Sequence, residues 1–224
     1  MDMTTHTSHG LKTSEMTVAF VDLAGFSSIA DVFGDESSIA VLDLFEGLVR
    51  DHVGEEGRLI KWIGDEAMLV FPDPDTALKA LGRLLPACRK EQAIPLTRSG
   101  LNHGQVIHRS GDVFGTTVNV AARITAFASP GQVLASEVIA DTASESGIAI
   151  DALGPVALRS FAQKVPLFSI QLAEAVDPAW IDPVCKMHAP YAAFIKERRE
   201  GPWFCSKRCE EAYLKSPETY ATDR

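Results

Sequence analysis

Residues 61–71 read KWIGDEAMLVF, and this stretch decides how the sheet of the chain is built. Two apolar runs, 58–63 and 67–71, flank Gly64-Asp65-Glu66, which predicts two short strands joined by a hairpin turn. A turn explains the glycine and one polar neighbour. It does not explain two adjacent carboxylates at the tip, or Lys61 four residues before Asp65. The hairpin is therefore also a candidate functional site.

Strand-like and helix-like stretches alternate on both sides of the hairpin. TVAFVDLAGF (17–26) predicts a buried strand that ends at a tight turn, and 35–53 has apolar residues at helical spacing. Further helices are expected over 73–90, with Asp75 as N-cap, and over 119–128. Two short strands are expected around Gly104, and late strands in QVLAS, ALGPVALRSF and PLFSIQLAE. The pattern predicts an α+β fold in which a mixed sheet carries helices on one face.

Composition limits the classes of protein to which the chain can belong. It has 224 residues, 46% of them hydrophobic, and a net charge of −9. This apolar content excludes a disordered chain, and the acidic surface argues against nucleic-acid binding. No apolar run is long enough for a membrane span, and the polar start lacks the apolar stretch of a signal peptide, so a cytoplasmic protein is expected. We expect a leader (1–14), a main domain (15–173), a linker (174–180) and a small cysteine-rich domain (181–224).

Two aspartates lie where predicted strands end. Asp22 closes the first strand, and Asp65 sits at the hairpin tip. Neighbouring antiparallel strands could bring both carboxylates together, which suits Mg²⁺ or Mn²⁺. The following turn and helix start, with Gly25 and Phe26, offers N–H groups for phosphates. The alternative is purely structural: Asp22 caps a helix and Asp65 completes a turn.

A second polar pattern lies in GDVFGTTVNVAARI (111–124). Asn119 and Arg123 are four residues apart on a predicted helix, so they share one face. An amide and a guanidinium on one face can hold a sugar ring and a phosphoryl group. The alternative is an ordinary exposed helix face.

Taken in order, these motifs resemble the catalytic domain of class III nucleotidyl cyclases over about residues 15–173. FVDLAGFS resembles the first metal-aspartate motif, KWIGDEAMLVF the hairpin with lysine and metal aspartate, and TRSGLNHG the arginine-bearing strand. GDVFGTTVNVAAR resembles the segment with Asp, Asn and Arg. The resemblance implies a ferredoxin-like, palm-type mixed sheet.

The resemblance also implies a role for each matching position in making cyclic AMP from ATP. Two Mg²⁺ or Mn²⁺ ions would be bound by Asp22 and Asp65. Lys61 and Asp112 would bind the edge of the adenine, and Asn119 would orient the ribose. Arg123 would stabilise charge on the α-phosphoryl group, and Arg98 would contact the terminal phosphates.

Active sites of this family lie between two catalytic domains, so the resemblance implies a symmetric homodimer with two sites. One alternative is a catalytically weak regulatory protein of the same fold that binds nucleotide or metal. Another is a GGDEF-type diguanylate cyclase, but Ile63 stands where that family has a second glycine, and VNVAAR has no counterpart there.

Three of the four cysteines lie in the last forty residues, which in a cytosolic chain favours a metal site. Cys88 lies alone in a helical pattern, and we expect it to be buried. The tail resembles the YHS domain in DPVC.M, FCS..C and P..Y, with Cys185, Cys205 and Cys209 as ligands for Zn²⁺ or Cu⁺. The fourth position could be filled by His188, by water or by nothing. A structural metal, a metal or redox sensor and a partner-docking module all remain open.

Overall fold

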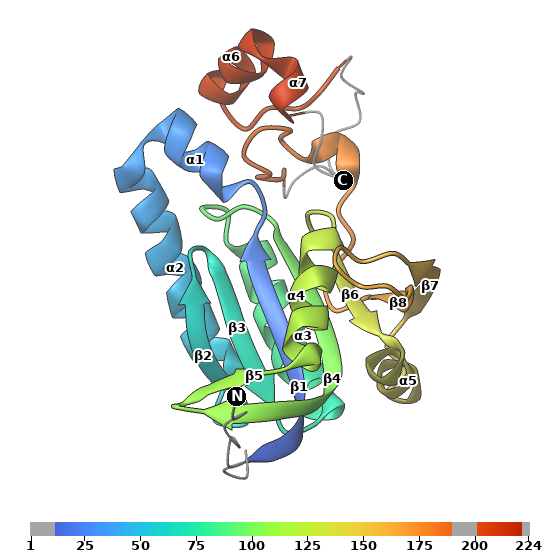
Figure 1. Cartoon of the computed structure of the whole chain (residues 1–224). Helices are drawn as coiled ribbons and strands as arrows, with labels where there is room; N and C mark the ends of the chain where they lie inside the picture. The colour runs from blue at the N-terminus through green and yellow to red at the C-terminus, as the bar shows by residue number, and fades with distance from the viewer. Residues whose placement is uncertain (1–11, 190–200, 221–224) are drawn as a thin grey trace, which may run out of the picture.

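An eight-stranded sheet forms the centre of the molecule in the computed structural model, which describes residues 12–189 and 201–220 (Figure 1). The strand order is β2-β3-β1-β4-β6-β8-β7, and β5 pairs with β4 outside this path. The β4–β6 pair is parallel and the other pairs are antiparallel, so the sheet is mixed. The strands are β1 Thr13–Leu23, β2 Arg58–Ile63, β3 Glu66–Phe71, β4 Thr97–Arg109, β5 Asp112–Phe114, β6 Val133–Ser136, β7 Ile150–Val156 and β8 Val165–Ile170.

Helices cover both faces of this sheet. They are α1 Phe26–Phe33, α2 Asp35–Val53, α3 Pro74–Lys90, α4 Thr116–Phe127, α5 Glu137–Glu145, α6 Lys207–Lys215 and α7 Pro217–Tyr220, with a short 3₁₀ helix η1 Pro178–Trp180. Among the described residues, none of these helices is both long and apolar enough to cross a membrane.

Strand β1 shows why two layers of helices form. Side chains of a strand alternate between the two faces. Ala19 and Val21 pack in the same cluster as residues of α1, α2, α3 and α5, whereas Val18 and Phe20 pack in a cluster that includes Ala121 of α4. The predicted α+β fold with a mixed sheet is confirmed. The expectation that helices lie on one face is wrong for α4, because the central strands are apolar on both sides.

Helix α4 approaches the sheet closely at one glycine of β4. A Cβ atom at Gly100 would lie 2.3 Å from the backbone nitrogen of Thr125 and 2.7 Å from the carbonyl oxygen of Ala121. Any side chain there would push α4 outward. Gly100 therefore fixes the position of the helix that carries Asn119 and Arg123.

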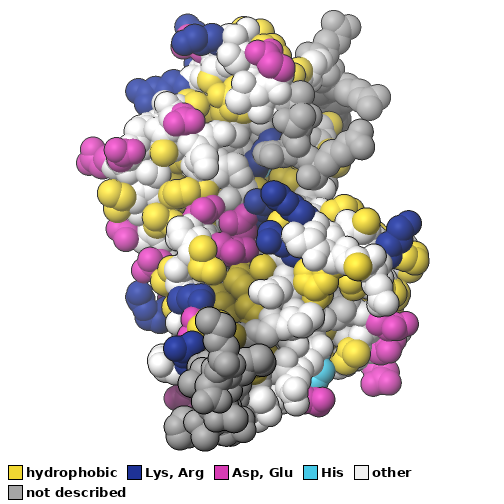
Figure 2. Space-filling model, viewed as in Figure 1, with side chains coloured by type: hydrophobic (Ala, Val, Ile, Leu, Met, Phe, Trp, Pro, Cys, Tyr) yellow, Lys and Arg dark blue, Asp and Glu magenta, His cyan; other side chains and the backbone are white. Residues whose placement is uncertain are grey.

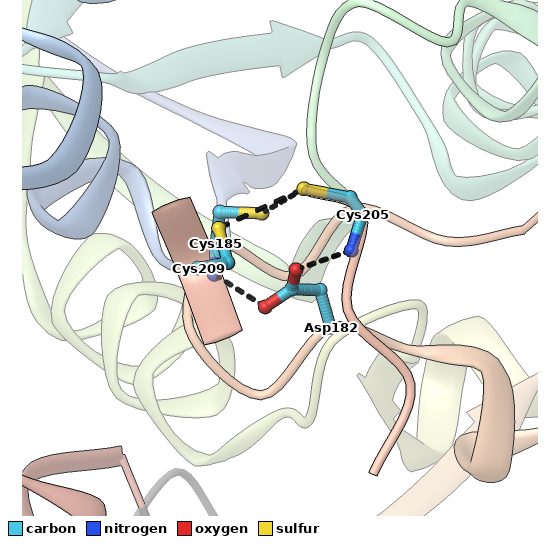
Figure 3. Close-up of side chains that lie close together, drawn as sticks. All are labelled: Asp182, Cys185, Cys205 and Cys209. Carbon is cyan, nitrogen blue, oxygen red and sulfur yellow. Dashed lines mark hydrogen bonds between the residues drawn. The ribbon is translucent and has the colours of Figure 1, made fainter. Parts of the chain in front are cut away.

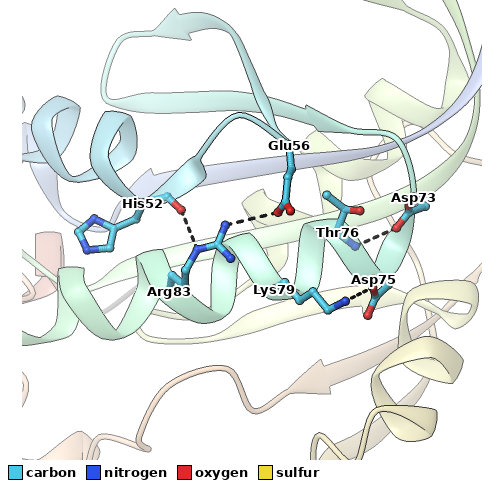
Figure 4. Close-up of polar contacts among 7 residues, drawn as sticks. All are labelled: His52, Glu56, Asp73, Asp75, Thr76, Lys79 and Arg83. Atoms are coloured by element: carbon cyan, nitrogen blue, oxygen red, sulfur yellow. Dashed lines mark hydrogen bonds and ion pairs between the residues drawn. The ribbon is translucent and has the colours of Figure 1, made fainter.

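Helix α3 is anchored at its start and along its exposed side (Figure 4). The N-cap is Asp73, not the expected Asp75, because the Asp73 carboxylate accepts a 2.8 Å hydrogen bond from the backbone N–H of Thr76. Such a cap stabilises a helix by about 1 kcal/mol. Asp75 instead forms a 2.5 Å ion pair with Lys79 one turn later.

Several elements differ from the sequence-based expectation. Residues 97–109 form one strand rather than two, and Gly104 lies inside it with a φ of 156°. Strand β5 and helix α5 were not expected. Helix α2, the hairpin, the late strands and the burial of Cys88 are confirmed. Helix α4 begins three residues earlier than predicted, at Thr116.

The C-terminal segment (177–189 and 201–220) packs against the main domain near the end of β1 and α1 (Figure 1). Val184, Cys185 and Cys209 are buried in the same apolar cluster as residues of α1, α2 and α3. The segment is therefore joined to the core of the main domain rather than separated from it by solvent.

Candidate active site

The two predicted metal aspartates lie side by side. Strand β1 pairs with β3 in a register that places Asp22 opposite Glu66, so the neighbouring Asp65 also reaches the end of β1. The two carboxylates are close enough that the charge of Asp22 raises the pKa of Asp65, and Asp22 is only 8% exposed. The antiparallel pairing of the two strands thus brings together residues 43 positions apart in the sequence.

These carboxylates resist ionisation. Burial raises the pKa of Asp22, although Arg98 opposes the shift. Burial and the negative charge of Asp22 raise the pKa of Asp65 to about 6 and that of Glu66 to about 7. A half-buried group of three carboxylates with raised pKa values is suited to hard divalent cations, which prefer oxygen ligands.

Glu66 was noted in the sequence as part of the turn but was not expected to belong to the site. The adjacent acidic residues of Gly-Asp-Glu were a visible signal. Only the cross-strand pairing of Asp22 with Glu66 shows that both turn carboxylates join the first aspartate.

Arg98 is a positively charged residue that lies beside these three carboxylates. It lies opposite Asp22 on β4, and its Nε donates a 2.6 Å hydrogen bond to Asp22 Oδ2. One guanidinium facing three carboxylates leaves an excess of negative charge once they ionise. The role of Arg98 toward phosphates stays a prediction, and the residue lies at the same site as the aspartates.

A cavity of about 300 Å³ opens beside these carboxylates. We call it the acidic cavity; it is lined by Asp22–Ser28, Asp65, Arg98, Ala128, Pro130, Thr219 and Tyr220. Gly25, with a φ of 73°, is the N-cap of α1 and offers no side-chain cap. The first N–H groups of a helix lack intrahelical acceptors, so the start of α1 at Phe26 can receive an anion beside the carboxylates.

Four more of the predicted residues lie outside the acidic cavity, and we call them the second polar group: Lys61, Asp112, Asn119 and Arg123. Lys61 Nζ donates a 2.6 Å hydrogen bond to Asp112 Oδ2 and lies 5.6 Å from the ring centre of Phe114. Partial burial acts to raise the pKa of Asp112, but its hydrogen bonds with Lys61 and with the Val113 N–H lower it overall. Asn119 and Arg123 are exposed on α4, four residues apart as expected.

The second polar group and the acidic cavity are separate in this chain. No residue of the second polar group lines the acidic cavity. Figure 2 shows acidic and basic side chains beside an apolar surface on the face of the molecule that carries α4. The chain thus presents two separate sets of the predicted residues.

The three C-terminal cysteines meet as expected, and a carboxylate joins them (Figure 3). The Sγ atoms of Cys185 and Cys205 are 3.4 Å apart, and those of Cys205 and Cys209 are 3.7 Å apart. The ligand atoms of these thiols and Asp182 all lie within 4.8 Å of one another. We call this set the cysteine cluster.

His188, the fourth ligand considered from sequence, is not part of this cluster. It pairs with Ile181 in an isolated β-bridge and lines a different cavity with Arg89 and Trp180. Asp182 was missed because nothing in the sequence distinguishes it from a turn residue before Pro183.

The thiols are arranged to bind a cation. The neighbouring thiols of Cys185 and Cys205 lower the pKa of Cys209, which favours its thiolate form. The thiolate is the form of cysteine that binds metals. Three thiols and a carboxylate are four groups of the kinds that bind Zn²⁺, and they lie close enough to share one ion.

Comparisons with known proteins identify the family of residues 10–171. The family described as Adenylate and Guanylate cyclase catalytic domain matches residues 10–171. A pH-sensitive adenylate cyclase of Mycobacterium tuberculosis is 35% identical over 161 residues, which is 70% of this chain and 41% of that protein. An adenylate cyclase of Streptomyces coelicolor is 35% identical over 127 residues, or 56% of this chain and 33% of that protein. The chain thus spans less than half the length of these relatives.

Solved structures share the fold. The adenylyl cyclase CyaB of P. aeruginosa superposes with a TM-score of 0.63 at 20% identity, over 71% of this chain and 96% of that chain. The guanylate cyclase domain of RhGC from Catenaria anguillulae, solved with GTP, gives 0.63 at 19% identity, over 73% and 100%. At these identities the likeness shows the fold alone.

Proposed function

Because the chain belongs to the adenylate and guanylate cyclase catalytic domain family, we propose that it is an adenylate cyclase, which converts ATP into 3′,5′-cyclic AMP and pyrophosphate. The observation that supports this most is the half-buried Asp22–Asp65 pair beside the uncapped start of α1. This arrangement suits a triphosphate bound through divalent cations.

The carboxylates of Asp22 and Asp65 would hold two Mg²⁺ or Mn²⁺ ions. When bound, one ion supplies a lowered pKa to the ribose 3′-hydroxyl and the other neutralises charge on the triphosphate. The N–H groups at Gly25 and Phe26 would hold phosphate oxygens, and Arg98 would be drawn from Asp22 toward the terminal phosphates. The chain then works by positioning and electrostatics, without a protein nucleophile.

The Lys61–Asp112 pair supports adenine as the base. Asp112 can accept a hydrogen bond from the adenine amino group at N6, and Lys61 can donate one to N1. Their 2.6 Å contact supports this assignment, because it places the donor and the acceptor side by side. Guanine presents the reversed pattern at this edge, so the pair disfavours GTP.

Asn119 would orient the ribose, and Arg123 would stabilise the charge that develops on the α-phosphoryl group. Since these residues lie outside the acidic cavity of their own chain, each complete site needs a second copy. We propose a symmetric homodimer in which one protomer supplies the acidic cavity and its partner the second polar group.

The family match over residues 10–171 and the position of the cysteine cluster support a division of the chain. We propose a catalytic domain over 15–173, a short linker over 174–180 and a C-terminal YHS domain over 181–224. The cysteine cluster of that domain would bind Zn²⁺ or Cu⁺, and the carboxylate of Asp182 favours the divalent ion.

Product analysis tests the proposed activity. The purified chain is incubated with ATP or GTP and Mn²⁺, and cyclic nucleotide and pyrophosphate are quantified. We expect cyclic AMP in excess over cyclic GMP, and its loss in Asp22→Ala. A chain that binds ATP with Mn²⁺ but forms no cyclic product would be a regulatory protein of this fold instead.

A further inference from the structure

The C-terminal segment reaches into the acidic cavity. Thr219 and Tyr220 of α7 line it together with Asp22, Asp65 and Arg98. These two residues lie about two hundred positions after Asp22 in the sequence and belong to the segment that carries the cysteine cluster. Nothing in the cyclase reaction described above requires them.

A chain of aromatic contacts links the cysteine cluster to this wall of the cavity. Phe204 precedes Cys205, and its ring centre lies 5.4 Å from that of Tyr213. Tyr213 follows Cys209 by one turn of α6 and stacks on Tyr220, with ring centres 6.4 Å apart. A cation that fixes Cys205 and Cys209 would therefore also fix the rings that hold Tyr220.

Residues next to the third thiol, Cys185, contact the opposite wall of the acidic cavity. Lys186, next to Cys185, accepts a 3.0 Å hydrogen bond at its carbonyl oxygen from the N–H of Leu96. A Cβ atom at Gly25 would lie 2.7 Å from Lys186 Cγ and 3.2 Å from the Val184 carbonyl oxygen. The backbone around Cys185 thus packs directly against the turn that begins α1.

Asp182 completes the cluster as a buried acceptor. Its Oδ1 accepts hydrogen bonds from the N–H groups of Val184 at 2.8 Å and Cys185 at 3.3 Å, and its Oδ2 accepts one from Cys205 at 2.7 Å. A carboxylate offers about four lone-pair positions, so these three donors leave one for a cation. Asp182 is fully buried, which makes a compensating positive charge favourable.

We propose that the cysteine cluster, with Asp182 as its fourth ligand, binds a thiophilic divalent cation, and that the loaded C-terminal segment holds Tyr220 across the acidic cavity as a gate against the triphosphate. Loss of the cation frees α7 and opens the cavity. This inference rests on the proposed function for the identity of the nucleotide, whereas the gate itself is a property of binding.

Substitutions of Tyr220 test the gate in the full chain loaded with stoichiometric Zn²⁺. Affinity for a non-hydrolysable ATP analogue with Mn²⁺ is measured by calorimetry, and KM and kcat by cyclic AMP formation. We expect Tyr220→Ala to bind the analogue at least about fivefold more tightly and to lower KM with little change in kcat, a coupling of ordinary size for two linked sites. Tyr220→Phe, which retains the ring, should behave as the unsubstituted chain does.

Leu214→Ala is the matched control, because Leu214 is a large apolar residue of α6 that is 70% exposed and does not line the cavity. It should leave analogue affinity unchanged. Weaker analogue binding in Tyr220→Phe would show that the hydroxyl contacts the nucleotide, and would overturn the gate. Unchanged affinity in Tyr220→Ala would overturn it as well.

The cation is tested separately with Co²⁺, whose thiolate charge-transfer absorption reports cysteine ligation without any turnover. One Co²⁺ per chain should give this band. Cys205→Ser, which alters an exposed thiol, should weaken the band and should raise the affinity for the ATP analogue as Tyr220→Ala does. Asp182→Asn should lower Co²⁺ affinity while the thiolate band persists. Cys88→Ala removes a buried thiol outside the cluster and should change neither reading.

Absence of the band, or a band with no effect of the cation on analogue affinity, would contradict the proposal. Measuring analogue affinity also separates the proposed gate from the proposed cyclase activity. If the gate responds to the cation but no variant forms cyclic nucleotide, the proposed activity fails and the gate stands.

Discussion

At the acidic cavity like charges lie close together, whereas at the second polar group opposite charges are already paired. Burial and repulsion raise the pKa of Asp65 to about 6, while the hydrogen bond from Lys61 helps to lower that of Asp112. The first arrangement is incomplete without added cations. The second is a preformed donor and acceptor that can meet a neutral, flat base. In the proposed function a triphosphate nucleotide would use both surfaces, one from each protomer.

The largest effect is expected from removing one charge in the acidic cavity. Asp65→Asn keeps the shape of the side chain but deprives the metal ions of an ionised ligand, so cyclic AMP formation with Mn²⁺ should fall by about a hundredfold or more. The same variant should have a higher melting temperature than the unsubstituted chain in chelator at neutral pH, because repulsion with Asp22 is relieved.

Asp75→Asn is the control, since Asp75 is an exposed aspartate that is paired with Lys79 on α3. It should change activity little. An Asp65→Asn variant with full activity would show that the acidic cavity does not hold the catalytic metal ions.

A smaller effect is expected from reversing the second polar group. In the double variant Lys61→Glu with Asp112→Ser, a carboxylate faces the donors of guanine and a hydroxyl faces its O6 acceptor. The ratio of kcat/KM for ATP to that for GTP should fall by about tenfold to a hundredfold, since mismatched polar groups in a site are strongly disfavoured.

The exposed pair Lys79 and Asp75 offers the same residue types at 2.5 Å. Lys79→Glu with Asp75→Ser should leave the nucleotide ratio unchanged. An unaltered ratio in the Lys61 double variant would mean that the base is read elsewhere.

The smallest effect is expected from pH. The folded pKa values of about 6 for Asp65 and about 7 for Glu66 lie above their usual values of 3.8 and 4.5. The contribution of these two groups to the stability of the metal-free fold is therefore fully present below about pH 4 and is lost as pH rises through the two folded values. Cations compete with protons here, so Mn²⁺ affinity should increase several-fold from about pH 5 to about pH 7.5.

Calorimetry in buffers of different ionisation enthalpy measures the protons that Mn²⁺ releases. Asp65→Asn should reduce this release. An Mn²⁺ affinity that does not change over this range would show that the carboxylates are ionised before the metal arrives.

Local patterns made part of this structure predictable. Helical spacing identified α2, and the turn Gly64-Asp65-Glu66 identified the β2–β3 hairpin. The order of the motifs predicts Asp22, Lys61 and Asp65 as site residues, because strand ends and turns can be recognised in the sequence.

Features that depend on long-range packing were not predictable in the same way. Glu66 joins the site only through its register opposite Asp22, and Arg98 pairs with Asp22 across β1 and β4. Asp182, and not His188, lies beside the cysteines. The chain reverses direction between Ile181 and His188, which form an antiparallel bridge. Tyr220 reaches the acidic cavity through docking of the C-terminal segment, for which a single sequence carries no periodic signal.

Mixing two inactive variants tests most directly whether the acidic cavity of one protomer works with the second polar group of its partner. Asp65→Ala and Lys61→Ala carry different affinity tags, and heterodimers are confirmed by sequential capture. Half the dimers of an equal, random mixture are heterodimers, and each has one intact site of two, so about a quarter of the unsubstituted activity should return. Heterodimers that form but stay inactive would contradict a site shared between two chains.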